Sequence, residues 1–333
     1  MSKKEKTISN IGEFGLIEFI KKNNTGAQKQ HNIYLDIGDD CFVFNSFKNS
    51  KYVVTTDILI EGTHFKTEYA SAKQIASKAV EVNVSDIAAM GTVKPLYLFV
   101  SIGIPKNTKE QYIKNLFKGI KQVCNKYNIH ISGGDTVCSK LLTISITLIG
   151  ITTKDVITRN NAKINDLIYV TNLFGDSGAG LNILLSNKKN LTKYEKNLVN
   201  KHLLPRARLK LANEISEKIN ITSMTDSSDG LNKSLELLTT ENKKGAEIFL
   251  EQIPLSKDLI KYTNNDFNKK YNYVLFGGED FELVFTINPR DKKKLESLSK
   301  KVVCIGKVTG TQKIKYFKND KQINFKNNEY KHF

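Results

Sequence analysis

A strand that leads into a carboxylate is the feature that most constrains this chain. Tyr52, Val53 and Val54 are followed by two threonines and Asp57, in a stretch that runs to Phe65 with the sequence VVTTDILIEGTHF. β-Branched and aromatic residues suit a pleated, half-buried surface, so we predict a strand here. A carboxylate at the end of a buried strand needs a cation or several donors, because burying it unpaired costs too much free energy. A strand end closed by a turn-forming Asp would give the same pattern, and that alternative stays open.

Hard oxygen donors surround this carboxylate, since Thr55 and Thr56 add hydroxyl and carbonyl oxygens beside Asp57. Such donors suit Mg²⁺, which takes carboxylates, keeps several waters and often shares its shell with substrate phosphates. Similar constructions recur, with acids at the ends of apolar elements: Asp40, Asp86, Asp135, Asp226 and Asp229. One cleft that gathers these acids would need several divalent cations, and polyphosphate chemistry is what such a cluster suits.

Asp86 is the most informative of these acids because it continues an apolar helical stripe. A helix is predicted from Ala72 to Met90, and on it Ile75, Ala79 and Val82 share one face. The next position on that face is Asp86, so the carboxylate should be buried and compensated. A final turn that twists the side chain out to solvent is the alternative.

Length and composition predict a folded two-domain protein. The 333 residues exceed one ordinary core. The chain has no apolar run long enough to span a membrane and no signal peptide, so a cytoplasmic protein with no membrane partner is expected. The formal charge of +17 raises nucleic acid as a partner. The lysines are scattered among asparagines without interleaved aromatic residues, so we expect no nucleic-acid binding.

The sequence predicts three parts: an N-terminal arm and helix (1–28), an N-terminal domain (29–152) and a C-terminal domain (153–333). A short strand over 129–131 should stop at the glycines of SGGDT, and GGEDFE should precede a strand over 283–287. The shared glycine-acid pattern suggests related halves. Gly175 to Gly180 should precede a helix over 181–185, where backbone N–H groups bind anions. No Walker A or protein-kinase motif occurs, so a nucleotide site must be of another type.

Eight ordered motifs resemble those of the thiamine-monophosphate kinase family, within the superfamily of aminoimidazole-ribonucleotide synthetase and selenophosphate synthetase. They are IGDD, TTDILIEGTHF, VNVSDIAAMG, GGDT, DLIYVTN-x-x-GDS-x-AGL, TDSSDGL, GGEDFEL and YKHF. The resemblance implies a two-domain α/β (α+β) fold like that of the synthetase, with a C-terminal α/β sandwich. It also implies a homodimer in which the N-terminal sheets pair.

The resemblance further implies ATP-dependent phosphorylation of thiamine monophosphate, with several Mg²⁺ ions and no residue acting as a general base. The implied metal ligands are Asp40, Thr55, Thr56, Asp57, Asp86, Asp135, Asp226 and Asp229. The implied ATP-binding residues are Gly134, Asp135, Arg159 and Ser228, and the implied substrate-binding residues are His64, Glu279 and Tyr330.

The chain departs from the family pattern at several loop positions without losing an implied metal ligand. Asn161, Asn165 and Asn172 stand where the family usually has glycine, and Asn tolerates left-handed backbone better than most residues. Ser227 replaces an apolar residue and Gly178 replaces Ala. Two rivals remain: a superfamily synthetase that activates an amide or selenide, and a basic nucleic-acid-binding module. The segment 21–32 lacks the reactive Cys that a selenophosphate synthetase needs.

Overall fold

The computed structural model describes residues 19–20, 22–23, 33–35, 43–44 and 46–326. The chain divides into two compact units, an N-terminal unit (1–87 with 93–154) and a C-terminal unit (88–92 with 155–333). The predicted arm (1–28), Asp40 and Tyr330 lie wholly or largely outside the described residues. Within the described part of the chain, no helix combines the length and apolar character needed to cross a membrane.

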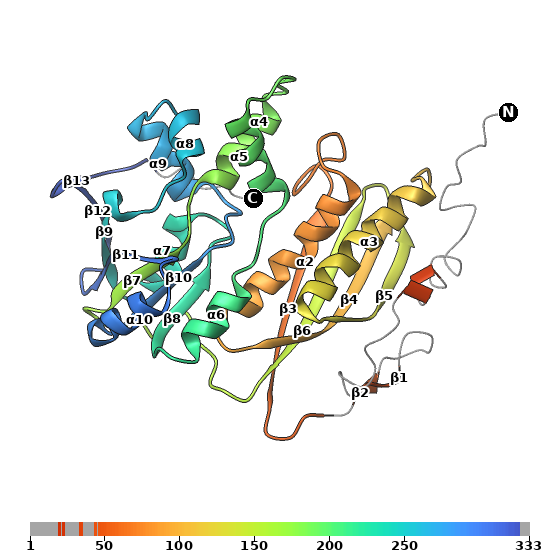
Figure 1. Ribbon diagram of the computed structural model, residues 1–333, viewed down its shortest axis with the longest axis horizontal. Helices are drawn as coiled ribbons and strands as arrows, with labels where there is room; N and C mark the ends of the chain where they lie inside the picture. The colour runs from red at the N-terminus through yellow and green to blue at the C-terminus, as the bar shows by residue number, and fades with distance from the viewer. Residues whose placement is uncertain (1–18, 21, 24–32, 36–42, 45, 327–333) are drawn as a thin grey trace. The chain divides into compact units, whose positions relative to one another are not determined.

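A four-stranded sheet in the order β3-β6-β4-β5 forms the N-terminal unit. Its strands are β3 (Lys51–Ile60), β4 (Lys94–Ile104), β5 (His130–Cys138) and β6 (Thr143–Thr152). β6 pairs antiparallel with β3 and β4, and β5 pairs parallel with β4. Helices α2 (Ala72–Ala89) and α3 (Glu110–Tyr127) both cover the same face of this sheet (Figure 1). A separate two-stranded sheet joins β1 (Ile33–Leu35) to β2 (Val43–Phe44).

Buried and more exposed residues alternate along β3 and β6 because helices α2 and α3 cover only one face of this sheet. Along β6 every second residue is buried, and Ile144, Ile146 and Leu148 pack beneath the helices. The opposite face carries Val54 and Ile58 on β3, which are 61% and 49% exposed. The N-terminal sheet therefore presents apolar side chains on a face that none of the described helices of its own unit covers.

Helix α2 begins as its sequence predicts, and α2 and α3 pack closely against each other. At Ser71 the hydroxyl accepts from the Gln74 N–H at 3.4 Å, and the Gln74 side chain accepts in return from the Ser71 N–H at 2.9 Å. α2 ends before Gly91, whose φ of 91° closes the helix. On α3, a Cβ added at Gly119 would lie 2.8 Å from that of Ala76, so these small residues allow the two helices to approach closely.

The C-terminal unit contains a seven-stranded sheet in the order β13-β12-β9-β11-β7-β10-β8. The strands are β7 (Leu167–Thr171), β8 (Ile221–Asp226), β9 (Gly245–Phe249), β10 (Leu283–Ile287), β11 (Val302–Thr309), β12 (Ile314–Lys318) and β13 (Lys321–Ile323). The helices are α4 (Asp176–Leu185), α5 (Lys193–Leu203), α6 (Leu209–Ser216), α7 (Leu231–Leu238), α8 (Lys257–Tyr262), α9 (Phe267–Phe276) and α10 (Lys292–Leu298). β10, which lies next to the edge strand β8, is buried along its whole length, so both faces of the sheet are covered there.

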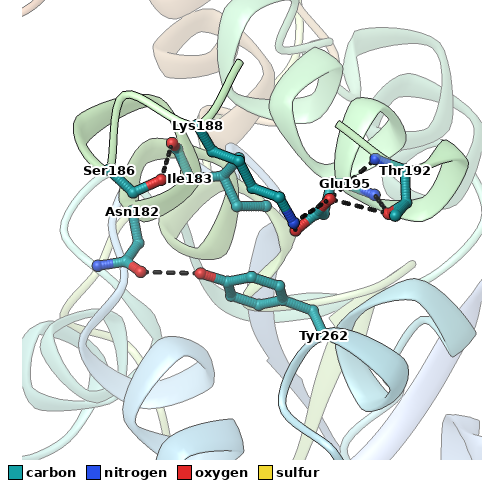
Figure 2. Close-up of polar contacts among 7 residues, drawn as sticks. All are labelled: Asn182, Ile183, Ser186, Lys188, Thr192, Glu195 and Tyr262. Carbon is teal, nitrogen blue, oxygen red and sulfur yellow. Dashed lines mark hydrogen bonds and ion pairs between the residues drawn. The ribbon is translucent and has the colours of Figure 1, made fainter. Parts of the chain in front are cut away.

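Helix α5 shows how the polar residues of this unit fix its local structure. Thr192 precedes it, and the Thr192 and Glu195 side chains each bond to the other residue's backbone N–H in a capping box. Figure 2 shows Lys188 reaching the same Glu195 carboxylate, with Nζ at 2.8 Å from Oε1. Glu195 is buried, and its charge is satisfied by neighbours from its own stretch of sequence.

Several predicted element boundaries were wrong. β3 continues past Asp57 to Ile60, so this acid lies within a strand and not at its end. β5 runs through Gly133, Gly134 and Asp135, whereas the GGEDFE stretch is a loop, so the repeated motif does not repeat a local structure. α4 begins at Asp176 and contains Gly178 and Gly180, which were expected ahead of it, whereas Gly175 does precede the helix. Asp226 does end an apolar element, strand β8, as expected, but helix α9 was not predicted at all.

Candidate active site

Three of the predicted metal ligands lie together in the N-terminal unit. Thr55 and Asp57 are two residues apart on β3, so their side chains share the face that α2 covers. From α2, Asp86 accepts a short hydrogen bond from the Thr55 hydroxyl. The predicted register of Asp86 with the buried helical face thus brings this carboxylate to the strand.

The negative charge of Asp57 is poorly compensated by its surroundings. Its Oδ2 is buried and, among the described residues, has no hydrogen-bond partner. Burial, and then the nearby charge of Asp86, raise the pKa of the Asp57 carboxyl to about 6. A divalent cation would remove both causes, because it replaces lost hydration and neutralises the two carboxylates together. The oxygen-only donor set of Thr55, Asp57 and Asp86 fits Mg²⁺.

The side chain of Thr56 does not join those of Thr55 and Asp57. Its side chain lies on the other face of the sheet, where its hydroxyl donates to the Ile146 carbonyl at 3.1 Å and accepts from Thr147 at 3.1 Å. Alternation along the strand therefore separates the Thr56 hydroxyl from the Asp57 carboxylate. Its role as a metal ligand stays a prediction that this hydroxyl does not support.

His64 lies in the turn that follows β3. Its Nδ1 accepts from the Ile60 N–H at 3.0 Å, which leaves the ring proton of the neutral imidazole on Nε2. Lys78, buried on α2, donates to the His64 carbonyl at 3.3 Å. The first contact orients the imidazole and the second holds the backbone of this residue, which is predicted to bind substrate.

Gly134 and Asp135 lie on β5 beside β4. A Cβ at Gly134 would overlap the Val100 carbonyl, so only glycine allows this approach of the two backbones. Asp135 is exposed, pairs in register with Ser101, and accepts from the Thr136 N–H at 2.7 Å through Oδ1. The residues predicted to bind ATP from this unit therefore lie on an accessible strand.

The C-terminal unit brings four further predicted residues together through two adjacent loops, 226–230 and 277–282. Asp226 ends β8 and pairs with Leu283 of β10. The Ser228 carbonyl accepts from the Glu279 N–H at 2.6 Å, and the Ser228 hydroxyl donates to Asp229 at 3.2 Å. Predicted ATP, metal and substrate residues thus occupy one small region of this unit.

Arg159 approaches the same strand from the loop before β7. Its carbonyl accepts from the Ser223 hydroxyl of β8 at 2.6 Å and from the Asn242 amide at 3.2 Å. The Arg159 side chain itself is exposed. An anchored backbone with an exposed guanidinium is suitable for binding phosphate.

A buried network beside these loops was missed by sequence reasoning. Glu282 accepts from Arg208 through both carboxylate oxygens and also from Thr171 at 2.6 Å and Asn172 at 3.0 Å. Asp280 accepts from the Gly175 and Ser177 N–H groups at the start of α4, at 2.7 and 3.1 Å. Burial raises the pKa of Asp280 to about 8, against the lowering effect of those backbone donors. The motif GGEDFEL contained both acids, but nothing in the sequence identified their partners.

The same residues line a pocket of about 620 Å³ within the C-terminal unit. Arg208, Asp280 and Glu282 border it together with Asp176 and Lys201. In the described part of the chain, no group of three or more His, Cys, Asp and Glu side chains is arranged to hold a metal ion.

Comparisons with known proteins decide the family. Residues 38–152 match the AIR synthase related protein N-terminal domain, and residues 163–319 match the corresponding C-terminal domain. Thiamine-monophosphate kinase of Buchnera aphidicola subsp. Schizaphis graminum is 38% identical, over 96% of this chain and 98% of its own length. The chain belongs to the thiamine-monophosphate kinase family. The resemblance carried by the eight motifs is thereby confirmed.

Solved structures of this kinase family agree. AaThiL complexed with AMPPCP and TMP aligns with a TM-score of 0.77 at 31% identity, covering 99% of this chain and 100% of its own. The kinase of Stenotrophomonas maltophilia K279a aligns with a TM-score of 0.81 at 27% identity, covering 92% and 96%. The two-domain α/β fold is therefore confirmed, with its four-stranded and seven-stranded sheets. The individual site residues stay predictions.

Proposed function

We propose that this chain transfers the γ-phosphoryl group of ATP directly to thiamine monophosphate, giving thiamine diphosphate and ADP. The observation that carries the proposal is the full-length match to AaThiL complexed with AMPPCP and TMP. AMPPCP is an analogue of ATP, so that complex contains a nucleotide of the donor class. Because ATP is the donor, we place the reaction in the cytoplasm.

The acceptor needs no general base. Thiamine monophosphate is a phosphate monoester whose second pKa is about 6, so its attacking oxygen is already ionised near neutral pH. The obstacle is the repulsion between this dianion and the phosphates of ATP. Residues that neutralise charge and hold the two phosphates in line therefore supply most of the catalysis.

Oxygen donors of the N-terminal unit fit this task as Mg²⁺ ligands. Thr55, Asp57 and Asp86 would hold the ion from the N-terminal unit, because their oxygens share one face and Asp57 lacks a partner for Oδ2. Bound Mg²⁺ would neutralise the phosphates and polarise the transferred group. The remaining proposed ligands are Asp40, Thr56, Asp135, Asp226 and Asp229.

The remaining site residues bind the two substrates. We propose that Gly134, Asp135, Arg159 and Ser228 contact ATP, and that His64, Glu279 and Tyr330 contact thiamine monophosphate. The fixed backbones of Arg159 and Glu279 and the hydrogen-bonded imidazole of His64 support these roles, since a preorganised residue loses less entropy on binding.

We also propose that the chain is a homodimer through the open face of its N-terminal sheet. Val54 pairs with Ile149 and Tyr52 with Ile151, so an apolar stripe crosses β3 and β6. An apolar face of this kind favours association with the same face of a second copy, which is the usual geometry of a two-fold dimer. Val54→Asp should give a monomer in light scattering, whereas Ile164→Asp, at a similarly exposed site in the other unit, should leave the dimer intact. A dimeric Val54→Asp variant would refute this interface.

Phosphorus NMR tests the reaction itself. With ATP, Mg²⁺ and thiamine monophosphate, the resonances of a diphosphate ester and of ADP should grow at equal rates. Release of inorganic phosphate without a new diphosphate would refute the proposal. A phosphorylated protein isolated after rapid quenching with labelled ATP would refute direct transfer while leaving the overall reaction in place.

A further inference from the structure

His202 is a buried histidine to which the sequence assigned no role. It lies on α5 and is 2% exposed. Its Nδ1 lies 3.2 Å from Oε2 of Glu279 and 3.2 Å from the Ser177 hydroxyl. A buried imidazole directed at a proposed substrate-binding carboxylate can do more than fill space.

Glu279 is held in an unusual conformation. Its φ is 65°, a left-handed value that a residue with a Cβ adopts only where the surroundings enforce it. The surroundings do so: its N–H donates to Ser228, and a Cβ at Gly278 would lie 2.7 Å from that same carbonyl. The backbone is fixed, but the side chain is 25% exposed and needs its own support.

Ser177 is equally well placed to hold the imidazole. It lies in the first turn of α4, where its N–H donates to Asp280 at 3.1 Å. A Cβ at the following residue, Gly178, would lie 2.9 Å from Gly277, so α4 packs closely against the 277–282 loop. His202 therefore lies between two backbones that the fold has fixed.

We propose that His202 is a positioning residue that orients Glu279 toward thiamine monophosphate. The inference rests on the proposed function, because it assigns a support to a residue of that site. The imidazole Nδ1–H, shared between Oε2 of Glu279 and the oxygen of the Ser177 hydroxyl, holds the Glu279 carboxylate in one orientation. Thiamine monophosphate offers a thiazolium cation and an amino group on its pyrimidine, and a carboxylate in a fixed orientation attracts both.

Binding and turnover of two His202 variants test the proposal. A hydrogen bond to a charged group is worth enough that its loss in His202→Leu should weaken thiamine monophosphate binding about 10-fold. KM for this substrate should rise by the same factor, while kcat and KM for ATP change less than about 2-fold. His202→Asn places an amide N–H near the position of Nδ1 and should restore KM to within about 3-fold of the parent.

A double-mutant cycle separates positioning from a general structural role. In a Glu279→Gln background, His202→Leu should have no further effect on thiamine monophosphate affinity, because the carboxylate that it orients is gone. Additive losses, an equal rise in KM for ATP, or no rescue by His202→Asn would overturn the proposal. Thermal melting of each variant checks that it folds, and Ser177→Ala gives a second, smaller perturbation of the same imidazole.

Calorimetry of the full chain with thiamine monophosphate and AMPPCP distinguishes failure of this inference from failure of the proposed function. If the parent binds thiamine monophosphate but produces no diphosphate, the kinase proposal fails and the affinities of the variants still decide the role of His202. If the parent turns over normally and His202→Leu binds as tightly as the parent, only the positioning role is refuted. A parent that binds no thiamine monophosphate refutes both.

Discussion

Asp57 and Glu282 are both carboxylates on or beside a strand, yet their surroundings differ sharply. Glu282 is 3% exposed and accepts from a guanidinium, a hydroxyl and an amide of the protein. Asp57 is less buried, has Asp86 as its charged neighbour, and has no hydrogen-bond partner for its Oδ2 among the described residues. The C-terminal acid is compensated by the fold, whereas the N-terminal acid is not.

This difference separates structural acids from acids that bind ligands. Glu195 behaves like Glu282, since Lys188 and Thr192 satisfy it and its hydrogen bond to Lys188 lowers its pKa (Figure 2). A carboxylate that folding has already paired has little to gain from an external cation. A carboxylate that combines a raised pKa with an oxygen lacking a hydrogen-bond partner has much to gain, so Asp57 is the residue at which Mg²⁺ should matter most.

The largest effect is expected at Asp57 itself. Asp57→Asn should lower kcat/KM about a thousand-fold, because the proposed site loses a charged metal ligand. The same change should raise the Tm of the metal-free protein by roughly 2–4 °C, since it removes a partly buried negative charge. A variant that is inactive and less stable would instead indicate a structural acid like Glu282. Initial rates check the expected loss of activity, and melting curves with excess chelator check the expected rise in Tm.

Arg208→Met tests Glu282, the acid that the fold compensates. It leaves the Glu282 carboxylate buried without its cation, and breaking such a pair is strongly destabilising. Thr171 and Asn172 still donate to Glu282, so we expect a loss of about 3 kcal/mol in the free energy of unfolding, at the lower end of the usual range. Urea denaturation measures it.

The double variant Arg208→Met/Glu282→Gln is the matched control. It removes the orphaned charge and should recover at least a third of the lost stability, because a neutral amide is cheaper to bury than a carboxylate. Equal stability of the single and double variants would show that the carboxylate is not the source of the loss.

The sequence predicted that Asp86 lies on the buried face of its helix, but it did not predict the ion pair between Arg208 and Glu282. Spacing along α2 put Asp86 on the buried face, and the structure joins it to Thr55. Arg208 and Glu282 are 74 residues apart in unremarkable contexts, so only the fold reveals that they pair. α9 was missed because its lysines and tyrosines give no clean apolar stripe. Asp266, whose side chain accepts from the Lys269 N–H, was the one local signal for its start.

A pH series sharpens the contrast between Asp57 and Glu195, because the fold shifts the pKa values of these two acids in opposite directions. The raised pKa of Asp57, about 6 against 3.8, means that the metal-free fold loses stability as pH rises between these values. The lowered pKa of Glu195 means stability that is present above its ordinary pKa of 4.5 and is lost as pH falls below it.

Mg²⁺ should therefore raise the Tm more at pH 7.5 than at pH 5, because only the ionised Asp57 carboxylate binds the cation well. The difference should vanish in Asp57→Asn. A pH-independent shift in the parent would mean that other groups dominate Mg²⁺ binding.

The smallest effect is expected at the start of α5. Thr192→Ala removes a hydroxyl that accepts from the Glu195 N–H, and loss of such a cap costs about 1 kcal/mol. Activity should be unchanged, because Glu195 is satisfied by Lys188 and, on this account, binds no ligand. Thr192→Ser keeps the hydroxyl and should retain most of the stability. If Thr192→Ala lowered the apparent affinity for Mg²⁺, compensation by the fold would no longer distinguish structural acids from ligand-binding ones.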